Sequence, residues 1–249
     1  MLSTSLTAFL LLSFPVPAPA QNSQQDNELL VAAAADLAPL EAPLAQAFAR
    51  VGGGKVRFVL GASGLLTRQI EQGAPYDVFL SANEEFVAEL VRSGKLLPGS
   101  VRVYAHGRLG LWSPGGALRT LPDLLAPRVL HVALPNPTHA PYGAAARQLL
   151  RSDGLWSGLE PKVVYGQNVR QALQYAESGN AEAVITAWSL LLRLPGAVLL
   201  PDSAHAPIRQ AAGVVRGSPH ERAARRFLDF LTSEAGRRIL ADHGLTPAQ

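Results

Sequence analysis

The stretch KVRFVLGASGLLTRQIEQGAPYDVFLSAN, residues 55–83, decides the fold. Residues 55–60 and 76–80 are apolar runs of strand length, and residues 65–71 between them carry apolar side chains at helical spacing. A strand, a helix and a second strand in this order are typical of a β-α-β unit, in which the two strands lie parallel in one sheet. The alternation continues on both sides of this stretch, so the sequence predicts an α/β fold.

The alternation forms two series, which predict two lobes. The first series starts with a strand at residues 29–34 and a helix at 37–50; the second has strands at 129–133, 162–165 and 183–186 and helices at 143–151 and 169–177. Residues 101–112 and 208–215 are extended runs that we interpret as crossovers between the lobes. We therefore predict that lobe one comprises residues 29–107 plus 206–249 and that lobe two comprises residues 108–205. Each lobe is expected to be a mostly parallel sheet flanked by helices.

The beginning of the chain predicts export. Leu6–Phe14 is an apolar run too short to span a bilayer, and Ala18-Pro19-Ala20 has the small-x-small form of a signal-peptidase site. No Lys or Arg precedes the apolar run, which is a departure from the usual signal. We expect residues 1–20 to be a cleaved signal peptide, residues 21–28 to be a polar tail, and the mature protein to be periplasmic or otherwise extracytoplasmic.

Composition excludes several classes of function. The 249 residues include 22 Lys and Arg against 19 Asp and Glu, a net charge of +3 without a dense basic run, so a nucleic-acid partner is not expected. The chain has no Cys, which excludes disulfides, thiolate catalysis, Cys-ligated zinc and lipid attachment at a Cys.

Four short loops are candidates for a binding site. Each follows a predicted strand and begins a helix: Ala35-Asp36-Leu37, Gly61-Ala62-Ser63-Gly64, Ala140-Pro141-Tyr142-Gly143 and Gln167-Asn168-Val169. Such loops lie at the carboxyl edge of a sheet, and a helix N-terminus presents unpaired N–H groups and the positive end of its dipole. Two loops from each lobe therefore predict a site for one small anion.

Other chemistries fit the residues less well. Gly52-Gly53-Gly54-Lys55 resembles a phosphate loop, but Val56 follows where Ser or Thr is required. The loop around Ser63 is not a nucleophile elbow, because its second Gly comes one residue too early. The six His residues have no i, i+4 ligand spacing, and only His139 lies beside a candidate loop.

At these residues the sequence resembles the periplasmic molybdate-binding proteins of ABC transporters. The most specific stretch is residues 63–83, with Gln69-Ile70, Gly73-Ala74-Pro75 and an apolar strand that ends in Ser81-Ala82. Residues 31–37, 136–143 and 168–169 follow in family order, so the resemblance covers essentially the whole mature chain.

The resemblance implies a type II periplasmic-binding-protein fold, in which two lobes joined by crossover strands close on a tetrahedral oxyanion. It implies high-affinity binding of molybdate or tungstate for delivery to a membrane ABC permease, with no enzymatic activity, no cofactor and no bare metal ion. It places Ser63 as a donor through its hydroxyl and backbone, Tyr142 and Val169 as contacts from lobe two, and Ala35 and Asp36 as contacts from the first loop. We also expect a monomer.

The sequence departs from the family pattern at two positions. Ala35 stands where Ser or Thr is common, so a contact there must come from a backbone N–H. Ala187 stands where some members have a Tyr, and other members supply that Tyr at the position of Tyr142. Asp36 is a third concern, because an inward carboxylate would repel a bare dianion; we expect it to turn away and cap its own helix.

Alternatives remain open from the sequence. The ligand of the same fold could be phosphate, sulfate or a small organic anion, and an inward Asp36 would favour a protonated oxyanion. A hydrolase or transferase using Ser63 would need a His near that residue. A periplasmic sensor or chaperone domain would lack an ordered oxyanion cleft.

Overall fold

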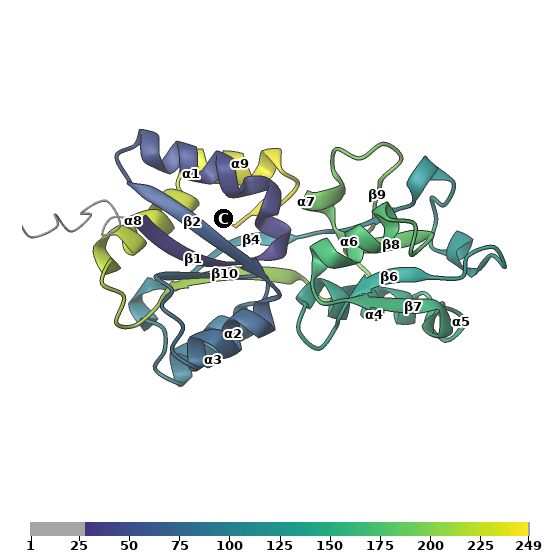
Figure 1. Ribbon diagram of the computed structural model, residues 1–249, viewed down its shortest axis with the longest axis horizontal. Helices are drawn as coiled ribbons and strands as arrows, with labels where there is room; N and C mark the ends of the chain where they lie inside the picture. The colour runs from purple at the N-terminus through teal and green to yellow at the C-terminus, as the bar shows by residue number, and fades with distance from the viewer. Residues whose placement is uncertain (1–27, 249) are drawn as a thin grey trace, which may run out of the picture.

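The computed structural model describes residues 28–248, which form two lobes side by side along the long axis of the molecule (Figure 1). One β-sheet forms the centre of each lobe. The predicted signal peptide and residues 21–27 of the predicted polar tail lie outside the described residues, and Glu28 already belongs to the first strand.

The first sheet has six strands in the order β11-β4-β10-β3-β1-β2. They are β1 (Glu28–Ala34), β2 (Lys55–Gly61), β3 (Val78–Ser81), β4 (Arg102–Gly107), β10 (Ile208–Val214) and β11 (Thr246–Pro247). Strand β1 is parallel to β2 and β3, whereas β10 is antiparallel to β3 and β4. The sheet is therefore mixed. Ala34 pairs with Gly61, so the loops that follow β1 and β2 begin side by side.

Helices cover both faces of the first sheet, with α1 and α9 on one side and α2 and α3 on the other (Figure 1). The bounds are α1 (Glu41–Arg50), α2 (Ser63–Glu71), α3 (Glu84–Arg92), α8 (Glu221–Thr232) and α9 (Glu234–Asp242). The helix expected over residues 37–50 is two helices, because a 3₁₀ helix, Ala35–Leu40, precedes α1. Asn83 caps α3, since its side chain accepts the Glu85 N–H at 3.0 Å.

The second sheet has five strands in the order β7-β6-β8-β5-β9. They are β5 (Leu109–Trp112), β6 (Val132–Pro135), β7 (Val163–Gly166), β8 (Ala183–Ala187) and β9 (Val198–Leu199), and the helices around them are α4 (Pro141–Ser152), α5 (Trp156–Leu159), α6 (Val169–Glu177) and α7 (Trp188–Leu191). Strand β6 is parallel to β7 and β8, while β5 is antiparallel to β8 and β9. The parallel strands again end near the helix starts that the sequence singled out.

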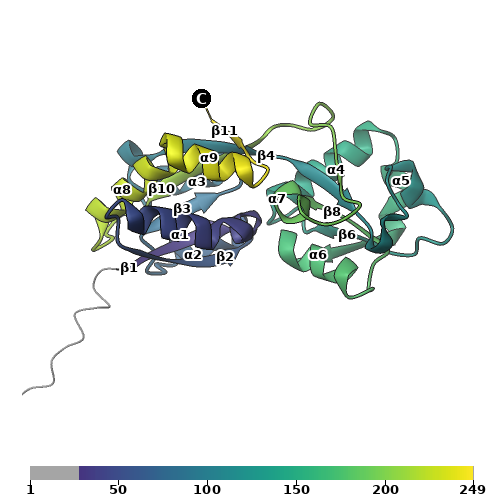
Figure 2. The same ribbon diagram turned by 90° about the horizontal axis from the view of Figure 1, so that it is seen from above.

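Two chain crossings connect the lobes (Figure 2). In the first, β4 of the first sheet is separated from β5 of the second sheet by Arg108 alone. In the second, the chain leaves β9 and returns to the first sheet as β10. We propose that these crossings are the lobe boundaries, with residues 29–107 and 206–249 in lobe one and residues 108–205 in lobe two.

Apolar packing holds each lobe together and continues across the junction. In lobe one, Phe48 packs edge to face on Phe227, with ring centroids 5.2 Å apart. A second apolar cluster fills lobe two and extends to Ala34, Ala35 and Ala82 of the first lobe. The loops of lobe one are therefore packed against lobe two. Within residues 28–248, no helix combines the length and the apolar character that a membrane crossing requires.

Candidate functional site

A small, narrow cavity lies between the lobes, at the ends of the parallel strands. Its walls come from all four loops that the sequence predicted, and its lining residues are Ala34, Ala35, Asp36, Gly61, Ala62, Ser63, Ala82, Ala140, Pro141, Tyr142, Asn168 and Val169. Ala35, Asp36, Ser63, Tyr142 and Val169, the five predicted contact residues, are all at most 4% exposed. The structure thus brings together residues up to 134 positions apart in sequence, from Ala35 to Val169.

Ser63 begins helix α2, so its N–H has no partner within the helix. Its Oγ accepts the N–H of Ala82 at 3.0 Å, which leaves the hydroxyl proton available to donate. Ser63 is also held by Thr67, whose hydroxyl donates to the Ser63 carbonyl at 2.9 Å. A buried loop therefore presents a backbone N–H and an O–H donor at one wall of the cavity.

Tyr142 is the second residue of helix α4, directly after Pro141 at its first position. Its hydroxyl donates to Asp36 Oδ2 at 2.9 Å and accepts from Gln210 Nε2 at 2.9 Å. Burial and the neighbouring Asp36 raise the pKa of the Tyr142 phenol well above its ordinary value, so the phenol stays protonated. The ring is therefore engaged with protein groups, and the backbone N–H is the donor that Tyr142 has left.

Val169 begins helix α6, and the residue before it secures that helix end. The side chain of Asn168 accepts from the N–H groups of Arg170 and Gln171, at 2.9 and 3.1 Å. The Thr186 hydroxyl donates to the Val169 carbonyl at 3.0 Å. The Val169 N–H is one of the helix donors without an intrahelical acceptor. Its position is thus fixed from both sides by neighbouring polar groups.

Asp36 does not cap its own helix, so that prediction is wrong. The cap position of the 3₁₀ helix is Ala34, and no side chain caps it. The Asp36 carboxyl instead accepts from Tyr142 and, at 2.6 Å, from Gln210 Nε2. The cause is tertiary: Asp36 is 1% exposed at the lobe junction, and two donors from β10 and α4 reach its Oδ2 there.

The environment of Asp36 is unusual for a carboxyl group. Burial raises its pKa from 3.8 to about 6, and the hydrogen bonds from Gln210 and Tyr142 offset only part of that rise. Among the residues that the structure describes, its Oδ1 has no hydrogen-bond partner, and neither does Gln210 Oε1. The site therefore contains a carboxyl group that is protonated more readily than an exposed one.

Further hydrogen bonds join the lobes around the cavity. The Ser189 hydroxyl donates to the Asp36 carbonyl at 2.7 Å, and the Gly64 N–H donates to the His139 carbonyl at 3.0 Å. Arg68 Nη2 lies 3.2 Å from His139 Nδ1. His139, which the sequence marked only by its position beside a loop, therefore contributes to the junction. Gln210 and Ser189 gave no signal in the sequence.

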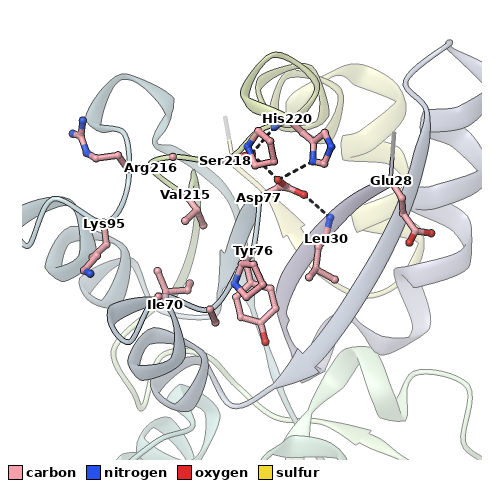
Figure 3. Close-up of a pocket in the computed structure, with 15 residues that line it drawn as sticks. Glu28, Leu30, Ile70, Tyr76, Asp77, Lys95, Val215, Arg216, Ser218 and His220 are labelled. Carbon is pink, nitrogen blue, oxygen red and sulfur yellow. Dashed lines mark hydrogen bonds and ion pairs between the residues drawn. The ribbon is translucent and has the colours of Figure 1, made fainter. Parts of the chain in front are cut away.

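A larger hollow of about 420 Å³ lies elsewhere on lobe one and contains a Ser, an Asp and a His (Figure 3). The Ser218 hydroxyl donates to Asp77 Oδ1 at 2.6 Å, and His220 Nδ1 lies 3.1 Å from the same oxygen. Asp77 Oδ2 also accepts the Leu30 N–H at 2.7 Å. Because the Ser218 proton is donated to the carboxylate rather than to the His, this cluster lacks the arrangement of a nucleophilic triad. It fastens the segment after β10 to β1 and β3.

Ser63 also lacks the His partner that a nucleophilic Ser requires. Its hydroxyl oxygen accepts the Ala82 N–H, and no His within residues 28–248 accepts its proton. The same residues contain no group of three or more His, Asp or Glu placed to hold a metal ion.

Comparison with known proteins finds relatives over most of the chain. Residues 29–246 match the model of a family described as bacterial extracellular solute-binding protein. The chain is 34% identical to the molybdate-binding protein ModA of Rhodobacter capsulatus over 88% of each chain. It is 33% identical to the molybdate-binding protein ModA of Azotobacter vinelandii over 88% of this chain and 90% of the relative.

Solved structures resemble the fold closely. The periplasmic molybdate-binding protein of Azotobacter vinelandii superposes with a TM-score of 0.83 at 31% identity, over 89% of this chain and all of the other. The sulfate-binding protein SubI of Mycobacterium tuberculosis superposes with a TM-score of 0.74 at 20% identity, over 90% of this chain and 88% of the other. At that lower identity the second match concerns the fold alone.

Proposed function

This chain belongs to the family of bacterial extracellular solute-binding proteins, and on that premise we propose that it captures molybdate or tungstate for an ABC permease. The observation that carries the proposal is the convergence of helix N-termini from both lobes on one small, buried cavity. Relatives named as molybdate-binding proteins, at 33–34% identity over most of the chain, support molybdate as the ligand.

The proposed donors are neutral groups. We assign the anion contacts to the backbone N–H groups of Ala35, Asp36, Ser63, Tyr142 and Val169 and to the Ser63 hydroxyl. Molybdate and tungstate are fully ionised near neutral pH, so they accept hydrogen bonds and have no proton to donate. Hydrogen bonds to a charged acceptor are short and strong, and a closed cavity without bulk water strengthens them further. No cofactor takes part in this binding.

The proposal also includes export of the protein and delivery of the anion to the permease. Family membership supports a location outside the cytoplasm, where the protein would bind the anion as a monomer and present its closed form to the permease. The anion would stabilise the closed form through contacts that exist only when the lobes meet.

A second candidate is a protonated oxyanion such as hydrogen phosphate. The observation that favours it is Asp36, whose carboxyl lies in the cavity wall and could accept the proton of such an anion. This candidate and the leading one differ in the anion that binds most tightly.

A thermal-shift panel on the mature protein tests the choice, with molybdate, tungstate, sulfate, phosphate and a small carboxylate at equal ionic strength. We expect molybdate and tungstate to raise the melting temperature at micromolar concentration and sulfate to need far more, because ligand binding to the native state alone stabilises it by mass action. A larger shift with phosphate than with molybdate would favour the second candidate. No shift with either metal oxyanion would refute the proposed function.

A further inference from the structure

A polar cluster of Asp36, Tyr142 and Gln210 lies in the cavity wall and joins the two lobes. Tyr142 comes from helix α4 of the proposed lobe two, and the other two residues come from the proposed lobe one. The three side chains are mutually hydrogen-bonded, at 2.6 Å between Gln210 and Asp36 and 2.9 Å for each bond to the Tyr142 hydroxyl. Two of these three bonds cross between the lobes, so the complete cluster belongs to the closed form.

No cation balances the Asp36 carboxyl among the described residues. Tyr142 faces it from α4, Tyr104 from β4 and Gln210 from β10, while Ser189 of α7 bonds to its main-chain oxygen. Both phenols have pKa values raised well above the ordinary range, so every one of these groups is neutral at physiological pH. An ionised Asp36 would therefore be a buried, unbalanced charge, which is costly.

The hydrogen-bond pattern also favours a neutral Asp36 carboxyl. Asp36 Oδ1 and Gln210 Oε1 are both buried acceptors without a donor in the described chain. A proton on the carboxyl would convert one acceptor of the cluster into a donor and reduce this shortage. A dianion in the same cavity adds a like charge close to Asp36, which favours the neutral carboxyl further.

We propose that Asp36 is protonated in the closed, anion-bound protein, so that capture of a molybdate dianion takes up one proton. The inference rests on the proposed function, because it places the dianion in this cavity. In this role Asp36 is a specificity-determining residue: its protonated form admits a bare dianion, and its ionised form excludes it.

The direction of the pH dependence follows from the two states. Separation of the lobes would expose the carboxyl to water and return its pKa towards the ordinary 3.8; in the closed protein burial raises it to about 6, and the bound dianion would raise it further. The bound form thus holds a proton that the open form has lost. Affinity therefore falls as pH rises, by up to tenfold per pH unit, until pH exceeds the pKa of the carboxyl in the complex.

Titration calorimetry with sodium molybdate on the mature protein tests the proposal, at pH 6, 7 and 8 and in buffers of different ionisation enthalpy. Molybdate itself does not titrate in this range, so the proton uptake reports on the protein. We expect an uptake approaching one proton per anion at pH 7, and a steady loss of affinity towards pH 8. Asp36→Asn should abolish both the uptake and the pH dependence, and bind molybdate more tightly than the wild type at pH 8.

Two further variants separate this role from a structural one. Tyr142→Phe removes a hydrogen bond that lowers the pKa of Asp36 in the closed form, so the loss of affinity should continue to a higher pH than in the wild type. Asp153→Asn changes an exposed carboxyl at the C-terminal end of α4, the helix that carries Tyr142 near its start. This variant should keep the wild-type pH dependence.

The outcomes are distinguishable from those that test the function. Tight molybdate binding without proton uptake would overturn this inference and leave the proposed function standing. If Tyr142→Phe leaves the pH range of the affinity loss unchanged, this inference is overturned as well. If molybdate does not bind at any pH, the proposed function fails as well.

Discussion

Ser63 Oγ accepts a hydrogen bond from the Ala82 N–H at 3.0 Å, while its own proton remains free to donate. One side chain therefore stabilises the loop and offers a donor to the cavity. This double role explains why a Ser rather than a Gly or Ala suits the start of α2. It also means that its removal has two separable costs, one on binding and one on stability.

We expect Ser63→Ala to weaken molybdate binding by roughly 10- to 100-fold, because a hydrogen bond to a charged acceptor contributes about 1.5–3 kcal/mol. The unpaired, buried Ala82 N–H should also lower the free energy of unfolding by about 1–3 kcal/mol. Calorimetry and chemical denaturation measure the two effects. Ser178→Ala, at the exposed C-terminal end of α6, is the matched control and should change neither. Unchanged affinity in Ser63→Ala would remove Ser63 from the site.

The raised pKa of Asp36 predicts a stability effect in the ligand-free protein too, in proportion to the share of that protein that is closed, because burial raises the pKa only in the closed form. A carboxyl with a folded-state pKa of about 6 and an unfolded value of 3.8 favours folding at low pH, and this contribution is lost as pH rises through that interval. At pH 8, Asp36→Asn should therefore stabilise the protein by up to about 3 kcal/mol, and near pH 4 the gain should vanish. Thermal melts of both proteins across pH 4–8 measure this, and a variant that is less stable than the wild type at pH 8 would contradict it.

At the scale of the element, the start of helix α2 packs closely against the backbone of lobe two. The Gly64 N–H bonds to the His139 carbonyl, and a Cβ added at Gly64 would lie 3.2 Å from that oxygen and 3.3 Å from His139 Cα. Gly64 therefore allows a helix N-terminus to approach the opposite backbone closely. The glycine thus serves lobe closure as well as packing within its own lobe, where Phe86 Cζ would lie 3.1 Å from the added Cβ.

We expect Gly64→Ala to weaken molybdate binding several-fold and Gly64→Val to weaken it far more, because each added atom holds the lobes apart. The ligand-free melting temperature should change less than the affinity, because within lobe one only the Phe86 side chain, 3.1 Å from the added Cβ, has to move. Gly99→Ala is the matched control, because a Cβ there meets nothing within 4 Å. Equal affinities for Gly64→Val and the wild type would show that the lobes do not close as the structure has them.

The sequence predicted the four loops because each element carries a local signal. The apolar runs before Ala35 and Ser63 and the Asn168 cap before Val169 are short-range patterns, and parallel strands bring their ends to one edge of a sheet. Gln210 escaped prediction because it lies 174 residues from Asp36 and has no local feature of a binding residue. The orientation of Asp36 was predicted wrongly for the same reason. Its local sequence favours a helix cap, but hydrogen-bond donors on elements far away in the sequence determine where its carboxyl lies.

At the scale of the whole molecule, the lobes are joined by the two crossings and by a ring of hydrogen bonds around the cavity. The first crossing is short, with only Arg108 between β4 and β5, and the second spans residues 200–207. Motion of one lobe against the other must therefore bend the chain at a few residues, while each lobe moves as a unit about its own sheet.

Molybdate should convert a range of open and closed forms into the closed form alone. The chain has no Cys, so two introduced Cys residues can carry spin labels without background. Val51 and Leu130 are 65% and 63% exposed and lie in different proposed lobes, so labels at Val51→Cys and Leu130→Cys report on the distance between the lobes. We expect pulsed electron paramagnetic resonance to give a broad distribution of distances between the two labels without ligand, and a single narrower distribution at saturating molybdate.

The control is a pair within one lobe, Leu130→Cys with Tyr165→Cys, whose distance should not respond to the ligand. Adding Gly64→Val to the cross-lobe pair should keep the distribution broad, because the clash with His139 opposes the closed form that the anion selects. If the cross-lobe distribution is equally narrow with and without molybdate, the lobes are closed before the ligand arrives. The anion would then have to enter a preformed cavity, and affinity would no longer depend on closure.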